Sequence, residues 1–97
     1  MNAPPAPDGA QEQARFCAAT LQDLDAIIEL EQSAYALPWS RMSFADLISH
    51  QGSACGDYVV QLLWAQQHPG MDVLQGYFVA LIGADEVHLL NMAVHPF

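Results

Sequence analysis

A single polar side chain, Asn91, interrupts an otherwise apolar stretch near the end of the chain, Leu89–Val94. If this stretch is a buried strand, the Asn91 amide must find partners inside the protein, because leaving them unmade costs roughly 1–3 kcal/mol. A local break in the strand pairing, with Asn91 bonded to the backbone, would satisfy it. Such a break would also leave main-chain N–H and C=O groups for a ligand, and a main-chain N–H aimed at a developing oxyanion is a common catalytic device. The simpler interpretation is a core strand with one internally bonded Asn.

His88 lies directly before this stretch, six residues before Val94. An imidazole titrates near neutral pH, so His88 could accept a proton from an ammonium group through a water molecule. The alternative, a strand histidine satisfied by its neighbours, is the simpler one.

Two further candidates for substrate binding lie upstream. Trp39 follows Pro38, which fixes the backbone, and its ring could cover an incoming peptide or fill a corner between two helices. Glu31 could attract a protonated amine or be a solvated helix residue. No spacing typical of metal ligands links the remaining histidines and the two cysteines, so we expect no metal site and reduced thiols; these residues are His50, His68, His95, Cys17 and Cys55.

The elements that must position these side chains begin with a short strand at 15–19, after a leader, residues 1–14, that is rich in Pro, Ala and Gln and that we expect to be flexible. Thr20 and Asp23 approximate a capping box for a helix that Pro38 ends. Ser40 or Ser43 can cap a second, shorter helix. Residues 51–56 are expected to form a loop.

Three strand patterns follow, at 58–65, 73–82 and 86–94. The turn at 68–70 closes the first, and a tight hairpin at 83–85 joins the second to the third. Gly76, inside its strand, indicates a bulge or a close backbone approach. The order is strand, two helices and then a three-stranded antiparallel meander. This predicts an α+β fold in one domain, residues 15–97.

The composition limits the partners. The chain has 97 residues and a formal net charge of -9, with Arg15 and Arg41 as its only Lys or Arg. Nucleic acid and anionic membranes are therefore not expected as ligands, whereas a cationic peptide or amine suits an acidic surface. Without an export signal or a long apolar run, the chain is expected in the cytoplasm.

With these residues and this order of elements, the chain resembles the GNAT-type N-acetyltransferase superfamily, and within it the ribosomal-protein alanine N-acetyltransferases. Three stretches carry the resemblance: Ala19-Thr20 followed by Asp23-Leu24; Leu30-Glu31-Gln32 followed by Ala36-Leu37-Pro38-Trp39-Ser40 and Phe44; and Leu90-Asn91-Met92-Ala93-Val94 followed by Pro96.

The resemblance implies acetyl-CoA as co-substrate and no metal. It implies that the main chain of Met92, Ala93 and Val94 holds the pantetheine arm, and that Trp39 flanks the groove for the substrate peptide. The acceptor would be the N-terminal amine of a protein, an alanine on a ribosomal protein. The family's phosphate-binding loop and helix, and its proposed general base and acid, would follow Phe97, so the resemblance predicts a partial GNAT fold that is inactive alone. The alternative is a non-catalytic interaction module that pairs through the exposed edge of its last strand, as a homodimer or with another chain.

Overall fold

The computed structural model describes residues 14–52 and 57–96. The predicted leader, apart from Ala14, and most of the predicted loop at 51–56 lie outside these residues. Within these residues, seven elements follow one another: β1 (Ala14–Ala18), the 3-10 turn η1 (Leu21–Asp23), α1 (Leu24–Ala34), α2 (Arg41–Ser49), β2 (Asp57–His68), β3 (Met71–Ile82) and β4 (Val87–Val94). Neither α-helix is long and apolar enough to cross a membrane.

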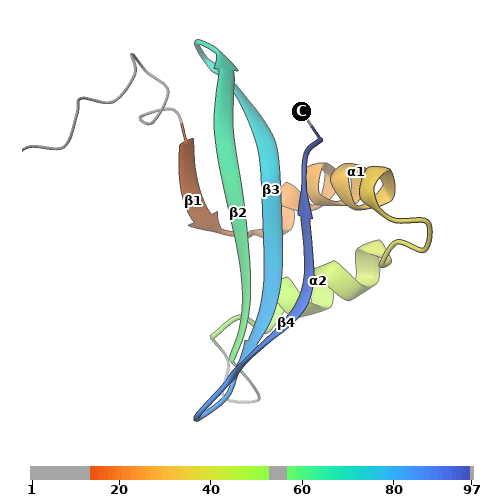
Figure 1. Ribbon diagram of the computed structural model, residues 1–97, viewed down its shortest axis with the longest axis vertical. Helices are drawn as coiled ribbons and strands as arrows, with labels where there is room; N and C mark the ends of the chain where they lie inside the picture. Colours follow the sequence, from red (N-terminus) through yellow and green to blue (C-terminus); the bar gives the residue numbers. More distant parts are fainter. Residues whose placement is uncertain (1–13, 53–56, 97) are drawn as a thin grey trace, which may run out of the picture.

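The four strands form one antiparallel sheet in the order β1-β2-β3-β4, and both α-helices lie beside the same face of this sheet (Figure 1). The α+β prediction is therefore confirmed, with the meander extended by β1 at one edge. β4 forms the opposite edge. The helices contact β2, β3 and β4, which places the core between one layer of helix and one layer of sheet.

Local signals fix where the helices begin. The backbone N–H of Thr20 donates to Oδ2 of Asp23 at 2.8 Å, which is the capping contact expected from the sequence. This cap opens the 3-10 turn η1, and α1 begins only after it, at Leu24. Ser40, not Ser43, caps α2, because its Oγ accepts from the Ser43 backbone N–H at 3.1 Å. Each cap supplies a partner for main-chain groups that the first helical turn leaves unpaired.

The core forms where the apolar stripes of the two helices meet the covered face of the sheet. Ile27 of α1 and Phe44 of α2 are fully buried, as are Val60, Leu62 and Val79 of the sheet. The Phe44 ring meets the edge of the Tyr77 ring, with the ring centroids 5.7 Å apart. Tyr77 is thereby held against the helices at the centre of β3.

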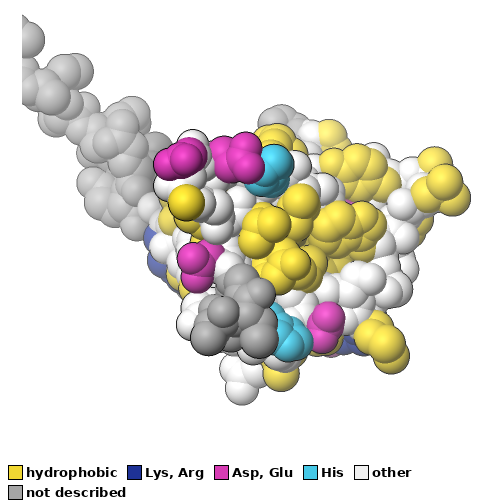
Figure 2. All heavy atoms as spheres, turned by 90° about the horizontal axis from the view of Figure 1, so that it is seen from below, with side chains coloured by type: hydrophobic (Ala, Val, Ile, Leu, Met, Phe, Trp, Pro, Cys, Tyr) yellow, Lys and Arg dark blue, Asp and Glu magenta, His cyan; other side chains and the backbone are white. Residues whose placement is uncertain are grey.

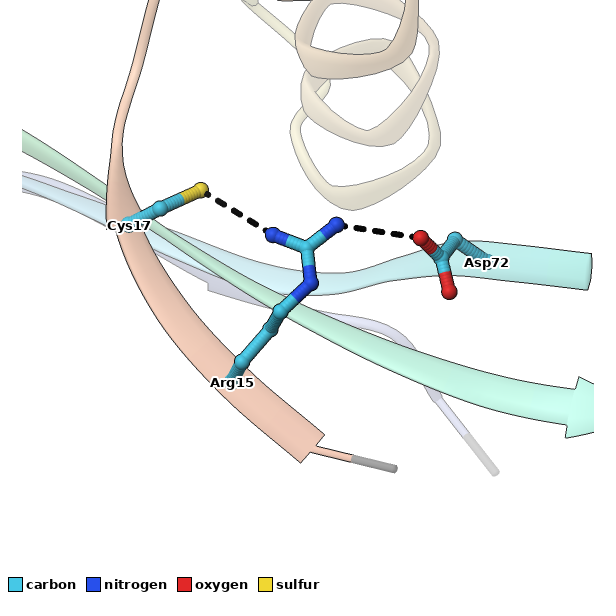
Figure 3. A network of polar contacts seen from close by, with 3 residues as sticks. All are labelled: Arg15, Cys17 and Asp72. Atoms are coloured by element: carbon cyan, nitrogen blue, oxygen red, sulfur yellow. Dashed lines mark hydrogen bonds and ion pairs between the residues drawn. The ribbon is translucent and has the colours of Figure 1, made fainter. Parts of the chain in front are cut away.

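Two sets of polar contacts join separate elements of the fold. The Gln51 side chain donates to the Ala19 carbonyl oxygen at 2.9 Å and accepts from the Val60 N–H at 3.0 Å, which joins the end of α2 to the sheet. At the surface, the Arg15 guanidinium reaches from β1 to Asp72 of β3 at 3.0 Å and lies 3.6 Å from the thiol of Cys17 (Figure 3). The ion pair is exposed and therefore contributes little to stability.

Candidate functional site

β4 contains a β-bulge beside Asn91. Val79 of β3 pairs with Asn91, but the next residue, Ala80, pairs with Leu89, so Leu90 has no partner in the ladder. The predicted interruption near Asn91 is confirmed. A bulge changes the local direction and twist of a strand, and this one separates the hairpin half of β4 from the half that carries Met92, Ala93 and Val94.

The partner of Asn91 differs from the one expected. Its Nδ2 donates to Oε1 of Glu31 on α1 at 3.0 Å, whereas the sequence predicted a bond to the backbone. The contact joins residues 60 positions apart, so no local pattern could indicate it.

Glu31 itself is buried, with 1% of its surface exposed. Its carboxylate accepts hydrogen bonds from the Tyr77 hydroxyl, the Asn91 amide and, at 2.8 Å, the backbone N–H of Trp39. The interpretation of Glu31 as a solvated helix residue is therefore wrong. One signal was present in the sequence: Glu31 lies four residues after Ile27, and this spacing places it on the apolar stripe of α1.

Burial and the hydrogen bond to Glu31 both raise the pKa of Tyr77 well above its ordinary value, with burial the larger cause. The phenol is thus held as a donor to the carboxylate. Tyr77 was not singled out from the sequence, because an aromatic residue in an apolar strand gives no sign of a polar partner.

The main chain of β4 beyond the bulge has one side turned to β3 and the other to an open edge. His95 N–H donates to the Gln75 carbonyl oxygen at 2.6 Å, and main-chain groups alternate in direction along an antiparallel strand. The N–H and C=O of Ala93 consequently point toward β3, and those of Met92 and Val94 point to the open edge. The hydroxyl of Tyr35 donates to the Met92 carbonyl oxygen, which agrees with this direction.

Gly76 permits the close packing of β3 on this part of β4. A Cβ at position 76 would lie 2.9 Å from the Ala93 carbonyl oxygen, which is closer than real Cβ atoms approach. The predicted close backbone approach is confirmed. Gln75, next to it, is also unpaired in the ladder with β2, since Leu63 pairs with Gly76 and Trp64 with Leu74.

A groove of about 380 Å³ borders this edge of β4. Residues from the end of α1, the α1–α2 connection and the bulged strand line it: Glu31, Tyr35, Leu37, Trp39, Leu89, Leu90, Asn91 and Met92. Trp39 packs on Phe44 with the ring centroids 5.4 Å apart, so it both fills the corner between the helices and lines the groove.

Trp39 and Leu90 also line a second hollow of about 340 Å³, on the side of α2, with Tyr58 and Leu47. The molecule seen from below, the end where α2 and the β3–β4 hairpin lie, shows apolar side chains gathered in one area with carboxylates and histidines at its margin (Figure 2).

His88 is placed apart from these groups. It pairs with Leu81 close to the hairpin, its Nε2 lies 3.0 Å from Oε1 of Glu86, and it is not among the residues that line either hollow. The structure thus brings Glu31, Trp39 and Met92 together and leaves His88 outside. In the described part of the chain, no three His, Cys, Asp or Glu side chains are grouped as metal ligands.

Comparison with known proteins gives one informative match. No family model and no curated protein matches the sequence. Among solved structures, the chain is similar to the ribosomal-protein-S18-alanine N-acetyltransferase from Escherichia coli, with 30% sequence identity and a TM-score of 0.63. The match covers 86% of this chain and 46% of that chain, so this chain spans less than half of the enzyme's length. The resemblance stated from the sequence is confirmed, and the two helices with the four-stranded antiparallel sheet match a partial GNAT fold.

Proposed function

We propose that this chain is the part of an acetyl-CoA-dependent protein N-terminal acetyltransferase that receives the thioester arm and the acceptor amine. One observation carries the proposal: beyond the bulge at Leu90, main-chain groups of Met92 and Val94 face an open sheet edge. Met92 lines the groove of Trp39, and its C=O accepts from the Tyr35 hydroxyl. A pantetheine arm contains two amide groups, and these can pair with such an edge as an added strand does.

In the proposed reaction, the neutral amine of the acceptor attacks the thioester carbonyl carbon. A C–N bond forms, the C–S bond breaks, and the thiolate of coenzyme A leaves and takes up a proton. A base must first remove the proton of the ammonium group. An N–H of the open edge, from Met92 or Val94, would stabilise the oxyanion, and Ala93 would support the edge from the core. His88 stays a predicted proton acceptor that reaches the amine only through water.

The residues present fit the arm of acetyl-CoA better than its nucleotide. Arg15 is paired with Asp72 and Arg41 with Asp25, and they are the only Lys or Arg of the chain. Among the described residues, a pyrophosphate therefore finds no unpaired Lys or Arg, and the net charge of -9 repels it. We infer that these 97 residues alone bind acetyl-CoA weakly and do not catalyse.

The same acidic surface favours a protonated N-terminal amine as acceptor. The similar enzyme from Escherichia coli is named for alanine acetylation of ribosomal protein S18. We extend this substrate class, an N-terminal alanine on a ribosomal protein, to the present chain and expect it to act in the cytoplasm. Leu37, Leu90 and Met92 supply apolar side chains to the groove, which agrees with an uncharged first residue.

Titration of the isotope-labelled chain with S-acetylpantetheine, followed by NMR, tests the proposal. The amide signals of Met92 and Val94 should shift most, and those of β1 should not. Val94→Pro removes one N–H from the open edge without removing a ladder bond and should abolish the response, whereas Val94→Ala should keep it. Shifts spread evenly over the surface, or no shift at all, would rule the function out.

A second candidate, a non-catalytic interaction module, is favoured by the exposure of β4. This strand is an edge of the sheet, and Val87, Leu89 and Val94 are 64%, 58% and 60% exposed. An apolar edge strand can pair with a second copy or with another chain. Size-exclusion chromatography with light scattering distinguishes the two: a folded dimer that gives no response to S-acetylpantetheine supports the module.

A further inference from the structure

We propose that Glu31 is a positioning residue for acetyl transfer, which fixes the bulged half of β4 relative to the α1–α2 connection. The inference rests on the proposed function, since it assigns one side of the groove to the thioester arm and the other to the acceptor. Glu31 touches neither reactant in this scheme, because 99% of its surface is covered by the protein's own groups.

Both oxygens of the Glu31 carboxylate are used. Oε1 accepts from the Tyr77 hydroxyl and from Nδ2 of Asn91, and Oε2 accepts from the Trp39 backbone N–H. Only a carboxylate accepts on both of its polar atoms. A glutamine would present an NH2 group to one of these donors, and no rotation of the amide avoids that conflict.

The donors belong to three different segments. Tyr77 comes from the centre of β3, Asn91 from the bulge of β4, and Trp39 from the connection between the helices. Asn91 and Trp39 line the groove from different segments, and Met92, which follows Asn91, begins the open edge. One side chain thus sets the distance between the edge that would hold the thioester and the loop that would hold the amine.

Charge makes this arrangement sensitive to the loss of any donor. None of the ion pairs found among the described residues includes Glu31, so hydrogen bonds alone compensate its burial. When a buried carboxylate loses a donor, its desolvation is no longer compensated and the fold is destabilised. The segment that supplied the donor is then free to move. The relative positions of the segments that line the groove therefore depend on the Glu31 carboxylate.

The test compares Glu31→Gln with Glu29→Gln, an exposed residue of the same helix. The affinity for S-acetylpantetheine and the NMR contact between the Asn91 side-chain amide and the Trp39 N–H are measured in both, together with urea unfolding. We expect E31Q to lose the contact and to bind about tenfold more weakly, and E29Q to match the original chain. Adding Asn91→Asp to E31Q returns a carboxylate to the pair and should restore most of the affinity.

A folded E31Q that keeps the original affinity would overturn the positioning role. If E31Q does not fold, Asn91→Ala decides instead, because it removes only the strand's contact: unchanged affinity overturns the proposal and weaker binding supports it. The proposed function fails in a different way, namely when the original chain itself gives no response to S-acetylpantetheine.

Discussion

The hydroxyl of Tyr35, the residue that caps the C-terminus of α1, donates a hydrogen bond to the main-chain carbonyl oxygen of Met92 in β4. Glu31, four residues earlier, binds the side chain of Asn91. The last turn of α1 therefore contacts two successive residues of the bulged strand, one through its side chain and the other through its main chain. The Met92 carbonyl is also one of the groups that we propose to pair with the pantetheine arm.

Tyr35→Phe tests whether the phenol competes with that arm. The change removes one hydrogen bond and should lower the free energy of unfolding by about 0.5–1.5 kcal/mol. Because the Met92 carbonyl oxygen is then available, the affinity for S-acetylpantetheine should rise. Urea unfolding and NMR titration measure the two quantities. A fall in affinity at unchanged fold would mean that Tyr35 supports the arm instead of competing with it.

Gly76→Ala should displace β4 from β3. The new Cβ would lie 2.9 Å from the Ala93 carbonyl oxygen, a backbone atom that cannot move without the strand, so we expect a loss of about 1–3 kcal/mol in the free energy of unfolding. Gly83→Ala is the matched control. Its Cβ would lie 3.3 Å from the Glu86 carbonyl oxygen at the hairpin, and the loss should be smaller. Equal losses in the two variants would contradict the close approach.

Tyr77 should make stability depend on alkaline pH. Burial and its bond to Glu31 raise its pKa in the folded chain, whereas in the unfolded chain the phenol titrates near its ordinary value of about 10. The stabilising contribution is complete below pH 10 or so and decreases above it, because only the unfolded chain then releases the proton. Unfolding free energies between pH 8 and 11 measure this decrease.

The fall in unfolding free energy with rising pH should be smaller in Tyr77→Phe than in the original chain. The variant should also be less stable at every pH, because Glu31 loses a donor. Tyr58→Phe, which removes a tyrosine that is not a donor to Glu31, should retain the full pH dependence. If both variants retain it, Tyr77 is not the group responsible.

Gln51→Ala should destabilise the junction of α2 with the sheet. The side chain supplies partners to the Ala19 carbonyl and the Val60 N–H, and both residues are buried, at 4% and 0% exposure. Leaving these groups without partners should cost about 1–3 kcal/mol in the free energy of unfolding, measured in urea. Gln32→Ala, at an exposed position of α1, is the control and should change it by less than about 0.5 kcal/mol.

The sequence alone determined the features that depend on near neighbours. The Thr20–Asp23 cap, the end of α1 before Pro38, the turn at 68–70 and the hairpin before β4 all follow from residues within a few positions of one another. The break near Asn91 and the close approach at Gly76 were also predicted, from an amide and a missing side chain inside apolar strands, although the partner of the amide was not. The order of these elements was sufficient for the α+β meander, and three residue stretches added the likeness to N-acetyltransferases.

Only the tertiary structure decided which groups meet. Glu31 reaches Tyr77 and Asn91 over separations of 46 and 60 residues, and Tyr35 reaches Met92 over 57. Such pairs form when the helix layer closes on the sheet, and neither spacing nor propensity records the direction in which a side chain then points. The direction of the main-chain groups of Met92, Ala93 and Val94 could not be predicted either, because it depends on the register of β4 with β3. A carboxylate that seemed solvated in the sequence is therefore buried, because packing brought enough donors to hold it there.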